Sequence, residues 1–382
     1  MTDEKEIERF RESLVLKRKK FEKNEPSDGS DVDSSSDGSR AEDSEDEVRL
    51  CKPGGYHAAK EGDKLFNKYN LITKLGRGHF STVWKGVEMA NGNEVAIKIQ
   101  KSAKSYRGSA MEEIEVHKYL SRKNGNKYLN LMLYNNTLKA ENGMHVCMVF
   151  PLMDMDLAKY AENFEDEKIP LNRTSEIAYQ LLSGTAFFHT RGVIHTDIKP
   201  ENIVMKVIDD KVSVQIADFG TACIVGDREN DYLQTSHYRS PEIILSYKQW
   251  GCPIDIWSLA CVFFECLTGQ YLFDGENEFD LFVSMIETLG QPRTSFLREC
   301  KSRRTYFGKD GNMNIGLMTN MSPLPLHRVL MEEVGFDRHD SDAISKLLLP
   351  MLEYDPGNRW TAQQLLALFP SSEVENEEVI QL

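Results

Sequence analysis

The hydrophobic pattern changes along the chain, and this change limits the folds that the sequence can adopt. Runs rich in β-branched and aromatic residues predict strands over Tyr69–Leu75, Ser81–Met89, Glu94–Gln100 and Val146–Met153. One helical stretch, Gly108–Ser121, interrupts them. After about Asn172, apolar residues at helical spacing predict helices over Thr174–His189, Ile254–Leu267, Phe279–Leu289, Ser341–Leu352 and Ala362–Phe369. The pattern predicts an α+β fold with a small β-rich lobe and a larger, mainly helical lobe.

Composition narrows the function classes. The chain has 382 residues, of which 40% are apolar, so it can bury a sizeable core. No apolar run is long enough to span a membrane, and the N-terminus MTDEKEIERF does not resemble a secretion signal. We therefore expect a cytoplasmic or nuclear protein. A net charge of −14 disfavours direct nucleic-acid binding and favours basic partners.

The two ends differ from the middle. Residues 1–24 alternate charged and apolar positions, which suggests a short helix, and the basic cluster Lys17–Lys20 is either an import signal or part of a solvated helix face. Residues 25–47 contain one aliphatic residue and no aromatic residue, so they are predicted to be disordered. We divide the chain into a charged, largely disordered tail over 1–53, an ordered domain over 54–370 and an acidic tail over 371–382.

Two segments of the predicted small lobe suggest a phosphate site. The loop LGRGHFSTV, Leu75–Val83, joins two strands, and Gly76 and Gly78 would let its backbone approach a phosphate, although such a loop is more often only a turn. Lys98 ends the apolar run Val95–Ile97 fifteen residues after Val83, and a lysine there needs an anionic partner. Glu113 is the preferred carboxylate, with Glu112 and Glu115 as rivals.

The stretch HTDIKPEN, His195–Asn202, carries the residues of a phosphoryl-transfer site. Asp197 would orient an attacking hydroxyl, Lys199 would reach the transferred phosphate, and Asn202 would supply a metal ligand. Asp218, in the sequence Asp-Phe-Gly sixteen residues after Asn202, would be the main ligand for magnesium.

Three further residues have expected structural roles. Glu242, in Ser-Pro-Glu, is predicted to pair with Arg359 across 117 residues of chain, which would anchor the segment that begins at Asp218. Asp255 is predicted to accept backbone N–H groups of the HTDIKPEN loop. Any one of these short motifs could arise by chance. Their order and spacing taken together are typical of a protein kinase.

The chain from about Gly54 to Phe369 resembles the SR-protein kinases, which phosphorylate arginine/serine-rich splicing factors. The stretches that carry the resemblance are GGYHAAKEGDKLFNKYNLITKLGRGHFSTVW (Gly54–Trp84), HVCMVFPLM (His145–Met153), HTDIKPEN and LLLPMLEYDPGNRWTA (Leu347–Ala362). The resemblance implies a bilobal kinase fold, with a smaller lobe at about 69–153 and a larger one at about 154–370. It also implies ATP and Mg²⁺ as cofactors, basic Arg/Ser-rich substrates and a monomer.

The resemblance extends to individual positions. It implies nucleotide binding by the following residues: Leu75, Gly76, Arg77, Gly78, His79, Phe80, Ser81, Thr82, Val83, Ala96, Lys98, Glu113, Pro151, Met153 and Asp218. It implies catalysis by Asp197, Lys199 and Asn202 and metal binding by Asn202 and Asp218. Asp280 and Glu287, seven residues apart, would line an acidic substrate groove or form an ordinary solvated helix face. The family's long spacer is missing between Asn202 and Asp218.

Thr196 departs from the common kinase pattern H-R-D, in which the arginine binds a phosphate on the activation segment. Threonine carries no charge for that contact, so we expect a constitutively active kinase. A LAMMER-type dual-specificity kinase is the alternative, but FDLFVSMIETLG stands where its hallmark EHLAMMER is expected. A pseudokinase scaffold is a further alternative, and it is disfavoured because every expected catalytic group is present.

Overall fold

The computed structural model describes residues 2–24, 51–122, 125–209, 211–227, 233–308 and 323–369. The tails predicted over 25–47 and 371–382 lie outside these ranges. The chain forms two compact units: Met1–Met153 with Asp218–Thr221, and Asp154–Ala217 with Ala222–Leu382.

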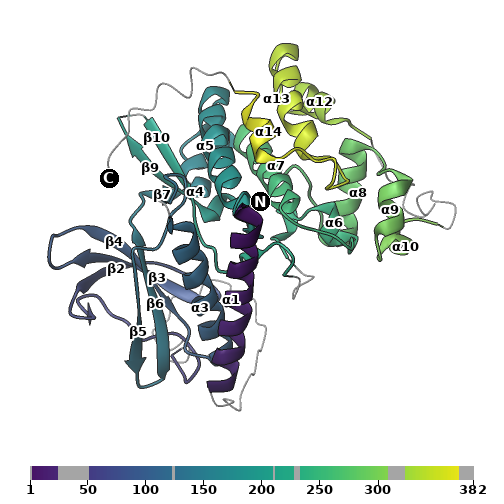
Figure 1. Ribbon diagram of the computed structural model, residues 1–382. Coiled ribbons are helices and arrows are strands. Elements are labelled where there is room, and N and C mark those ends of the chain that lie inside the picture. Colours follow the sequence, from purple (N-terminus) through teal and green to yellow (C-terminus); the bar gives the residue numbers. More distant parts are fainter. Residues whose placement is uncertain are drawn as a thin grey trace. The chain divides into compact units, whose positions relative to one another are not determined.

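The first unit is built on one antiparallel sheet, coloured blue in Figure 1. Its strands lie in the order β1-β2-β3-β4-β6-β5. Their bounds are β1 Lys64–Leu65, β2 Tyr69–Arg77, β3 Ser81–Glu88, β4 Glu94–Gln100, β5 Tyr134–Ala140 and β6 Gly143–Pro151. One face buries apolar side chains from the alternating positions of these strands, among them Leu71, Ile97 and Val149. This alternation explains why the β-branched runs predicted the central strands correctly.

Helix α3, Lys104–Leu120, covers the opposite face of the sheet. Its Ala110 and Ile114 pack on Val146 and Met148 of β6. Lys98 on β4 is the register partner of Met148, so both side chains emerge on the face that α3 covers. The sheet register therefore directs the one lysine of β4 toward the helix.

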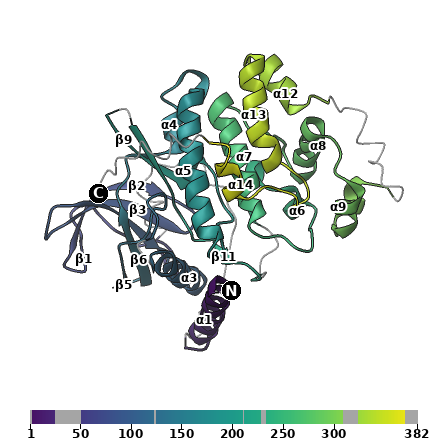
Figure 2. The same ribbon diagram turned by 45° about the horizontal axis from the view of Figure 1, so that its top comes forward.

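Helix α1, Thr2–Asn24, lies alongside α3 in both ribbon views (Figures 1 and 2). The sequence predicted a short helix somewhere in residues 1–24, but it did not predict this packing. Phe10 and Leu14 are each 6% exposed because they face α3. Within the ranges that the structure describes, no helix combines the length and apolar character needed to cross a bilayer.

The second unit is mainly helical. Its helical segments are α4 Leu157–Ala161, η2 Glu165–Glu167, α5 Leu171–His189, η3 Pro200–Asn202, η4 Ser236–Tyr238, α6 Pro241–Ile244, α7 Pro253–Thr268, α8 Glu278–Leu289, α9 Thr294–Glu299, α10 Arg303–Tyr306, α12 Leu326–Arg328, η5 Val329–Glu333, α13 Arg338–Met351 and α14 Ala362–Leu366. Helix α7 is apolar around its circumference, with Trp257 and Phe263 fully buried. It forms the centre of this unit.

Short strands of the second unit place the loop that contains Asp197. Strands β7 Met155–Asp156, β9 Ile203–Ile208 and β10 Lys211–Ile216 form one sheet, and β8 Val193–Ile194 pairs with β11 Cys223–Ile224. The HTDIKPEN loop therefore begins at the end of β8 and ends where β9 begins. Strands β9 and β10 lie between Asn202 and Asp218, the interval in which SR-protein kinases carry their long spacer.

Candidate active site

Lys98, Glu113 and Asp218 come together in the first unit. The Lys98 ammonium donates to both carboxylate oxygens of Glu113, at 2.8 and 3.0 Å, and to Oδ1 of Asp218 at 2.8 Å. Burial alone lowers the pKa of Lys98, but the adjacent carboxylates of Asp218 and Glu113 raise it overall, so the ammonium stays charged. Of the three candidate glutamates, Glu113 is therefore the partner of Lys98.

The loop between β2 and β3 is held by a backbone hydrogen bond to β3 and by Tyr56, which lies outside both strands. The Gly78 N–H donates to the Ser81 carbonyl at 2.9 Å, and the Tyr56 hydroxyl donates to the Gly78 carbonyl at 2.7 Å. A Cβ atom at Gly76 would meet no heavy atom within 4 Å, so the space beside this backbone is open. Leu75 and Phe80 are 46% and 48% exposed, as expected for side chains that border an open surface.

The segment after β6 contains Pro151 and Met153. The Pro151 carbonyl accepts a long hydrogen bond of 3.5 Å from the side chain of Asn130. The Met153 N–H makes no backbone hydrogen bond to any residue in the described ranges. Ala96, on β4, pairs with Phe150, which is the residue before Pro151. The strand register thus holds Ala96 next to this segment.

Asp255 fixes the shape of the loop around Thr196, as predicted. Its carboxylate accepts the N–H groups of His195 and Thr196, each at 2.9 Å, and His189 Nε2 lies 2.9 Å from it. Thr196 has φ 70°, which for a β-branched residue costs about 1–3 kcal/mol. The fully buried carboxylate of Asp255 on α7 holds this strained backbone in place.

Asp197, Lys199, Asn202 and Thr235 form the cluster at the centre of the second unit's site. The Thr235 hydroxyl donates to Asp197 Oδ1 at 2.6 Å and accepts from the Lys199 ammonium at 3.0 Å. Lys199 also lies 3.1 Å from Asp197 Oδ2. The Asn202 amide nitrogen donates to Oδ2 at 3.0 Å and to the Asp197 backbone carbonyl. These contacts hold the Asp197 carboxylate in one orientation.

Gln234 organises the end of the segment between Asp218 and Glu242. Its side-chain nitrogen donates to the Ile254 carbonyl at 2.9 Å and to the Ser258 hydroxyl at 2.8 Å. Its side-chain oxygen accepts both the N–H and the hydroxyl of Ser240. Arg239, 3% exposed, donates to the Gln234 carbonyl and pairs with Glu278 at 2.8 Å. The buried guanidinium of Arg239 therefore finds its hydrogen-bond acceptors and its counter-charge in the protein itself.

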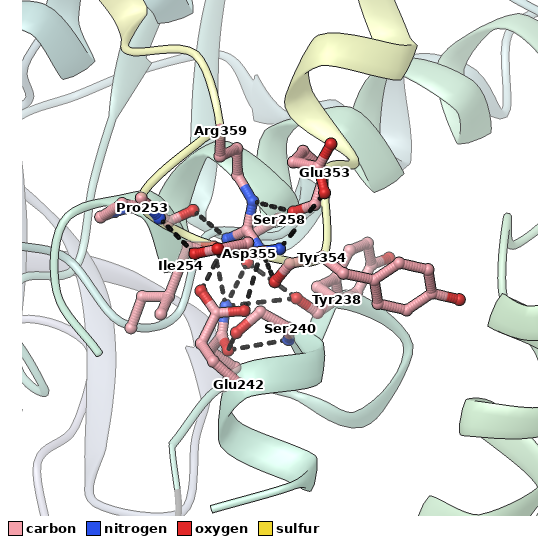
Figure 3. Close-up of polar contacts among 12 residues, drawn as sticks. Tyr238, Ser240, Glu242, Pro253, Ile254, Ser258, Glu353, Tyr354, Asp355 and Arg359 are labelled. Carbon is pink, nitrogen blue, oxygen red and sulfur yellow. Dashed lines mark hydrogen bonds and ion pairs between the residues drawn. The ribbon is translucent and has the colours of Figure 1, made fainter. Parts of the chain in front are cut away.

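Arg359 and Glu242 form the predicted buried ion pair (Figure 3). Two parallel hydrogen bonds of 2.6 and 2.9 Å join them, and both side chains are 0% exposed. The guanidinium also donates to the carbonyls of Pro253 and Glu353, and it lies 5.1 Å from the Trp257 ring. The pair thus ties the segment after Ser240 to the start of α7 and to the loop after α13.

Asp280 and Glu287 both lie on α8, and both are partly exposed. Asp280 accepts a hydrogen bond of 2.7 Å from the side chain of Asn277, the N-cap residue of α8. The backbone carbonyl of Glu287 accepts from Leu324. Neither side chain is part of the Asp197 cluster. Helix α8 connects to the activation segment, residues 218–242, through the Arg239–Glu278 pair.

Glu265 on α7 accepts a 2.6 Å hydrogen bond from the Tyr238 hydroxyl. Burial raises the pKa of Glu265 to about 7. The hydrogen bond from Tyr238 opposes this rise, and the nearby charges of Glu201 and Glu167 add to it. Glu265 is therefore a carboxyl group that changes charge near neutral pH.

The pKa of Glu265 predicts a pH dependence of stability. Between about pH 4.5 and 7 the folded protein binds more protons at this site than the unfolded chain, so the free energy of unfolding falls as the pH rises through that window. Glu265→Gln is expected to reduce this fall by about 1–3 kcal/mol. Urea denaturation at the two ends of the window measures it. The exposed control Glu162→Gln should leave the fall unchanged, and equal behaviour of the two variants contradicts the prediction.

Sequence reasoning did not identify Tyr56, Gln234 or Arg239 as part of the site. Tyr56 lies in the stretch Gly54–Trp84 that carries the family resemblance, and this is the one signal in the sequence that points to it. Gln234 carries no comparable pattern, because its role depends on carbonyl and hydroxyl groups of α7 that only the fold brings to it.

Comparisons with known proteins agree with this geometry. A protein kinase domain model matches residues 69–368. The chain is 34% identical over 392 residues to the serine/threonine-protein kinase SRPK of Physarum polycephalum, covering 85% of this chain and 91% of that one. It is 30% identical to the probable serine/threonine-protein kinase dyrk2 of Dictyostelium discoideum, covering 81% of this chain and 33% of that protein. It is 31% identical to the dual specificity tyrosine-phosphorylation-regulated kinase 3 of Homo sapiens, covering 65% and 42%.

Proposed function

Because this chain belongs to the SR-protein kinase family of serine/threonine kinases, we propose that it transfers the γ-phosphate of ATP to serines of Arg/Ser-rich proteins such as splicing factors. The observation that carries the reaction chemistry is the Asp197 cluster, in which Thr235, Lys199 and Asn202 fix one carboxylate. The chain carries each group that phosphoryl transfer needs from the protein.

Each residue has a definite task in this proposal. Asp197 orients the serine hydroxyl and accepts its proton as the phosphoryl group is transferred. Lys199, which lies beside Asp197, offsets the negative charge on the transferred group. Lys98, held by Glu113, binds the phosphates that stay on the nucleotide. In-line positioning and charge neutralisation supply most of the rate enhancement.

The residues also suit a magnesium ion. Asp218 offers a carboxylate and Asn202 an amide oxygen, which are the hard oxygen ligands that Mg²⁺ prefers. The Asn202 amide nitrogen makes both of that side chain's hydrogen bonds, so the amide oxygen remains available as a ligand. A bound Mg²⁺ would neutralise charge on the phosphates.

We assign the nucleotide to the first unit. The backbone from Leu75 to Val83 would cover the phosphates, helped by the open space beside Gly76. The Pro151 carbonyl and the Met153 N–H would bond the adenine edge, with Ala96 beside them. Support for this assignment comes from the Met153 N–H, which the described backbone leaves for a ligand.

The substrate class rests on the family and on charge. Two acidic side chains, Glu201 and Glu265, lie near Tyr238 of the activation segment. Glu265 becomes fully charged only as the pH rises above about 7. Asp280 and Glu287 would add a groove on α8 for arginine side chains further along the substrate. An arginine-rich peptide is complementary to such a surface, and an acidic peptide is not.

We further propose that the kinase is active without phosphorylation of its activation segment. Gln234, Thr235 and Arg239 are bonded to protein groups, so no phosphate is needed to satisfy them. Thr196 stands where other kinases place the arginine that would bind such a phosphate. Action as a monomer in the cytoplasm or nucleus completes the proposal. Lys17 and Arg18 of the basic cluster are paired with Glu115 and Glu112, so we do not assign the cluster to import.

A peptide assay tests the substrate class. With ATP and Mg²⁺, we expect an Arg-Ser repeat peptide to be phosphorylated at least about 100-fold more efficiently in kcat/KM than a Ser-Pro peptide of equal length, a difference of about 2.7 kcal/mol. A Lys-Ser repeat peptide serves as the control for net charge. Preference for the Ser-Pro peptide contradicts the substrate proposal but not the kinase chemistry. Autophosphorylation on tyrosine would instead support the dual-specificity alternative.

A further inference from the structure

Helix α1 packs antiparallel on α3. Four pairs connect the helices: Phe10 with Tyr119, Lys17 with Glu115, Arg18 with Glu112 and Phe21 with Gly108. The rings of Phe10 and Tyr119 are stacked, with their centroids 3.9 Å apart and an angle of 11° between their planes. A Cβ atom at position 108 would lie 3.4 Å from the ring of Phe21, so glycine allows the close approach there. The contacts extend over nearly the full length of α3.

The contact residues occupy one face of each helix. On α1 the apolar residues Ile7, Phe10, Leu14 and Phe21 follow the spacing of a helical seam. On α3 the contact positions 108, 112, 115 and 119 follow the same spacing. Glu113, Ile114 and His117 lie on the other side of α3 and are buried, and Ile114 packs on the sheet. Helix α3 is thus held on both sides, by the sheet and by α1.

Two ion pairs join α1 to one face of α3. Arg18 donates to both oxygens of Glu112, each at 2.7 Å, and these side chains are 21% and 34% exposed. Lys17 pairs with Glu115 at 2.5 Å. A bidentate arginine–carboxylate pair is restrictive in geometry as well as favourable in energy. Glu112 is the immediate neighbour of Glu113 in the helix. A contact that fixes Glu112 against Arg18 therefore also limits the direction in which Glu113 can point.

We propose that α1 is a positioning element for phosphoryl transfer, which holds α3 in the rotation that keeps Glu113 on Lys98. Successive helix residues are about 100° apart, so a modest rotation of α3 moves the Glu113 carboxylate out of bonding distance. Kinases need the lysine–glutamate pair for activity, and the position of this helix commonly controls it. The inference rests on the proposed role of the Lys98–Glu113 pair. It gives Lys17 and Arg18 a function within the fold.

Charge reversal at Arg18 tests the proposal. Arg18→Glu repels Glu112, and we expect kcat/KM for ATP to fall about tenfold. Lys19→Glu is the matched control, because it makes the same charge change at the next residue, whose side chain is exposed. It should leave kcat/KM unchanged. Adding Glu112→Arg to Arg18→Glu reverses the pair and should restore most of the lost kcat/KM.

A second comparison separates positioning from simple stabilisation. If α1 acts through Glu113, then Arg18→Glu has little further effect on kcat/KM in a Glu113→Gln background, because the pair it supports is already lost. A merely structural role gives the same fold loss in both backgrounds. ATP affinity, measured by titration calorimetry, provides a readout that does not depend on residual activity.

The outcomes are distinct. Full activity of Arg18→Glu, an equal loss in Lys19→Glu, or an additive loss in the Glu113→Gln background overturns the role of α1. Full activity of Glu113→Gln itself overturns the proposed role of the Lys98–Glu113 pair, and with it the premise of the inference.

Discussion

Asp197→Asn is expected to lower kcat by about 10²–10⁴ while the fold stays intact. Asparagine has nearly the same shape as aspartate, and its side-chain oxygen can still accept from Thr235, which is 2.6 Å from Asp197 in the native protein. It lacks the negative charge with which, in the proposed mechanism, Asp197 accepts the serine proton. Single-turnover phosphorylation of an Arg-Ser peptide measures the loss, and a thermal melt confirms folding.

The control for this variant is Asp209→Asn, the same chemical change at an exposed position in the β9–β10 hairpin. Its activity should equal that of the native protein. If Asp197→Asn retained kcat within tenfold of the native value, Asp197 would not be the residue that accepts the proton, and a pseudokinase scaffold would regain support.

Breaking the buried pair between Arg359 and Glu242 is expected to have the largest effect on stability. Glu242→Gln leaves a guanidinium that is 0% exposed without its anion, and the free energy of unfolding should fall by about 3–5 kcal/mol. Arg359→Met leaves the buried carboxylate of Glu242 without its cation and should lower the free energy of unfolding by a similar amount. Urea denaturation of the second unit's transition provides the measurement.

Two comparisons make this result specific. The double variant Glu242→Gln with Arg359→Met removes both charges and should lose less stability than the sum of the single variants. Arg328→Met breaks the Arg328–Glu332 pair, whose side chains are 56% and 50% exposed, and should cost under about 1 kcal/mol. Equal small losses at the buried and exposed pairs would show that the Glu242 anchor contributes little to the fold.

The sequence predicted the parts of the fold whose signal is local. Strand β4, Glu94–Gln100, was predicted with its observed bounds, because Val95, Ile97 and Ile99 alternate on one buried face. Strand β5, Tyr134–Ala140, was missed because YNNTLKA is polar and lies at the edge of the sheet. The last predicted helix continued to Phe369, whereas α14 ends at Leu366.

The same distinction holds for the site. Lys98, Asp197 and Asp218 lie in short patterns with fixed neighbours, so sequence alone selected them as candidates. The sequence preferred Glu113 over Glu112 and Glu115, and the structure confirms that preference, because Glu113 bonds Lys98 while the two rivals bond to α1. The role of Gln234 depends on contacts with residues 20 and 24 positions away, which no local pattern encodes.

We propose that the kinase needs no phosphate on its activation segment, because Gln234, Thr235 and Arg239 are bonded by protein groups. The most direct test is phosphorylation of an Arg-Ser peptide by enzyme that a phosphatase has stripped of phosphate, with mass spectrometry confirming an unmodified segment over residues 218–242. We expect kcat and KM to equal those of the untreated enzyme. Loss of activity on dephosphorylation, and its return when the segment is phosphorylated again, would contradict it.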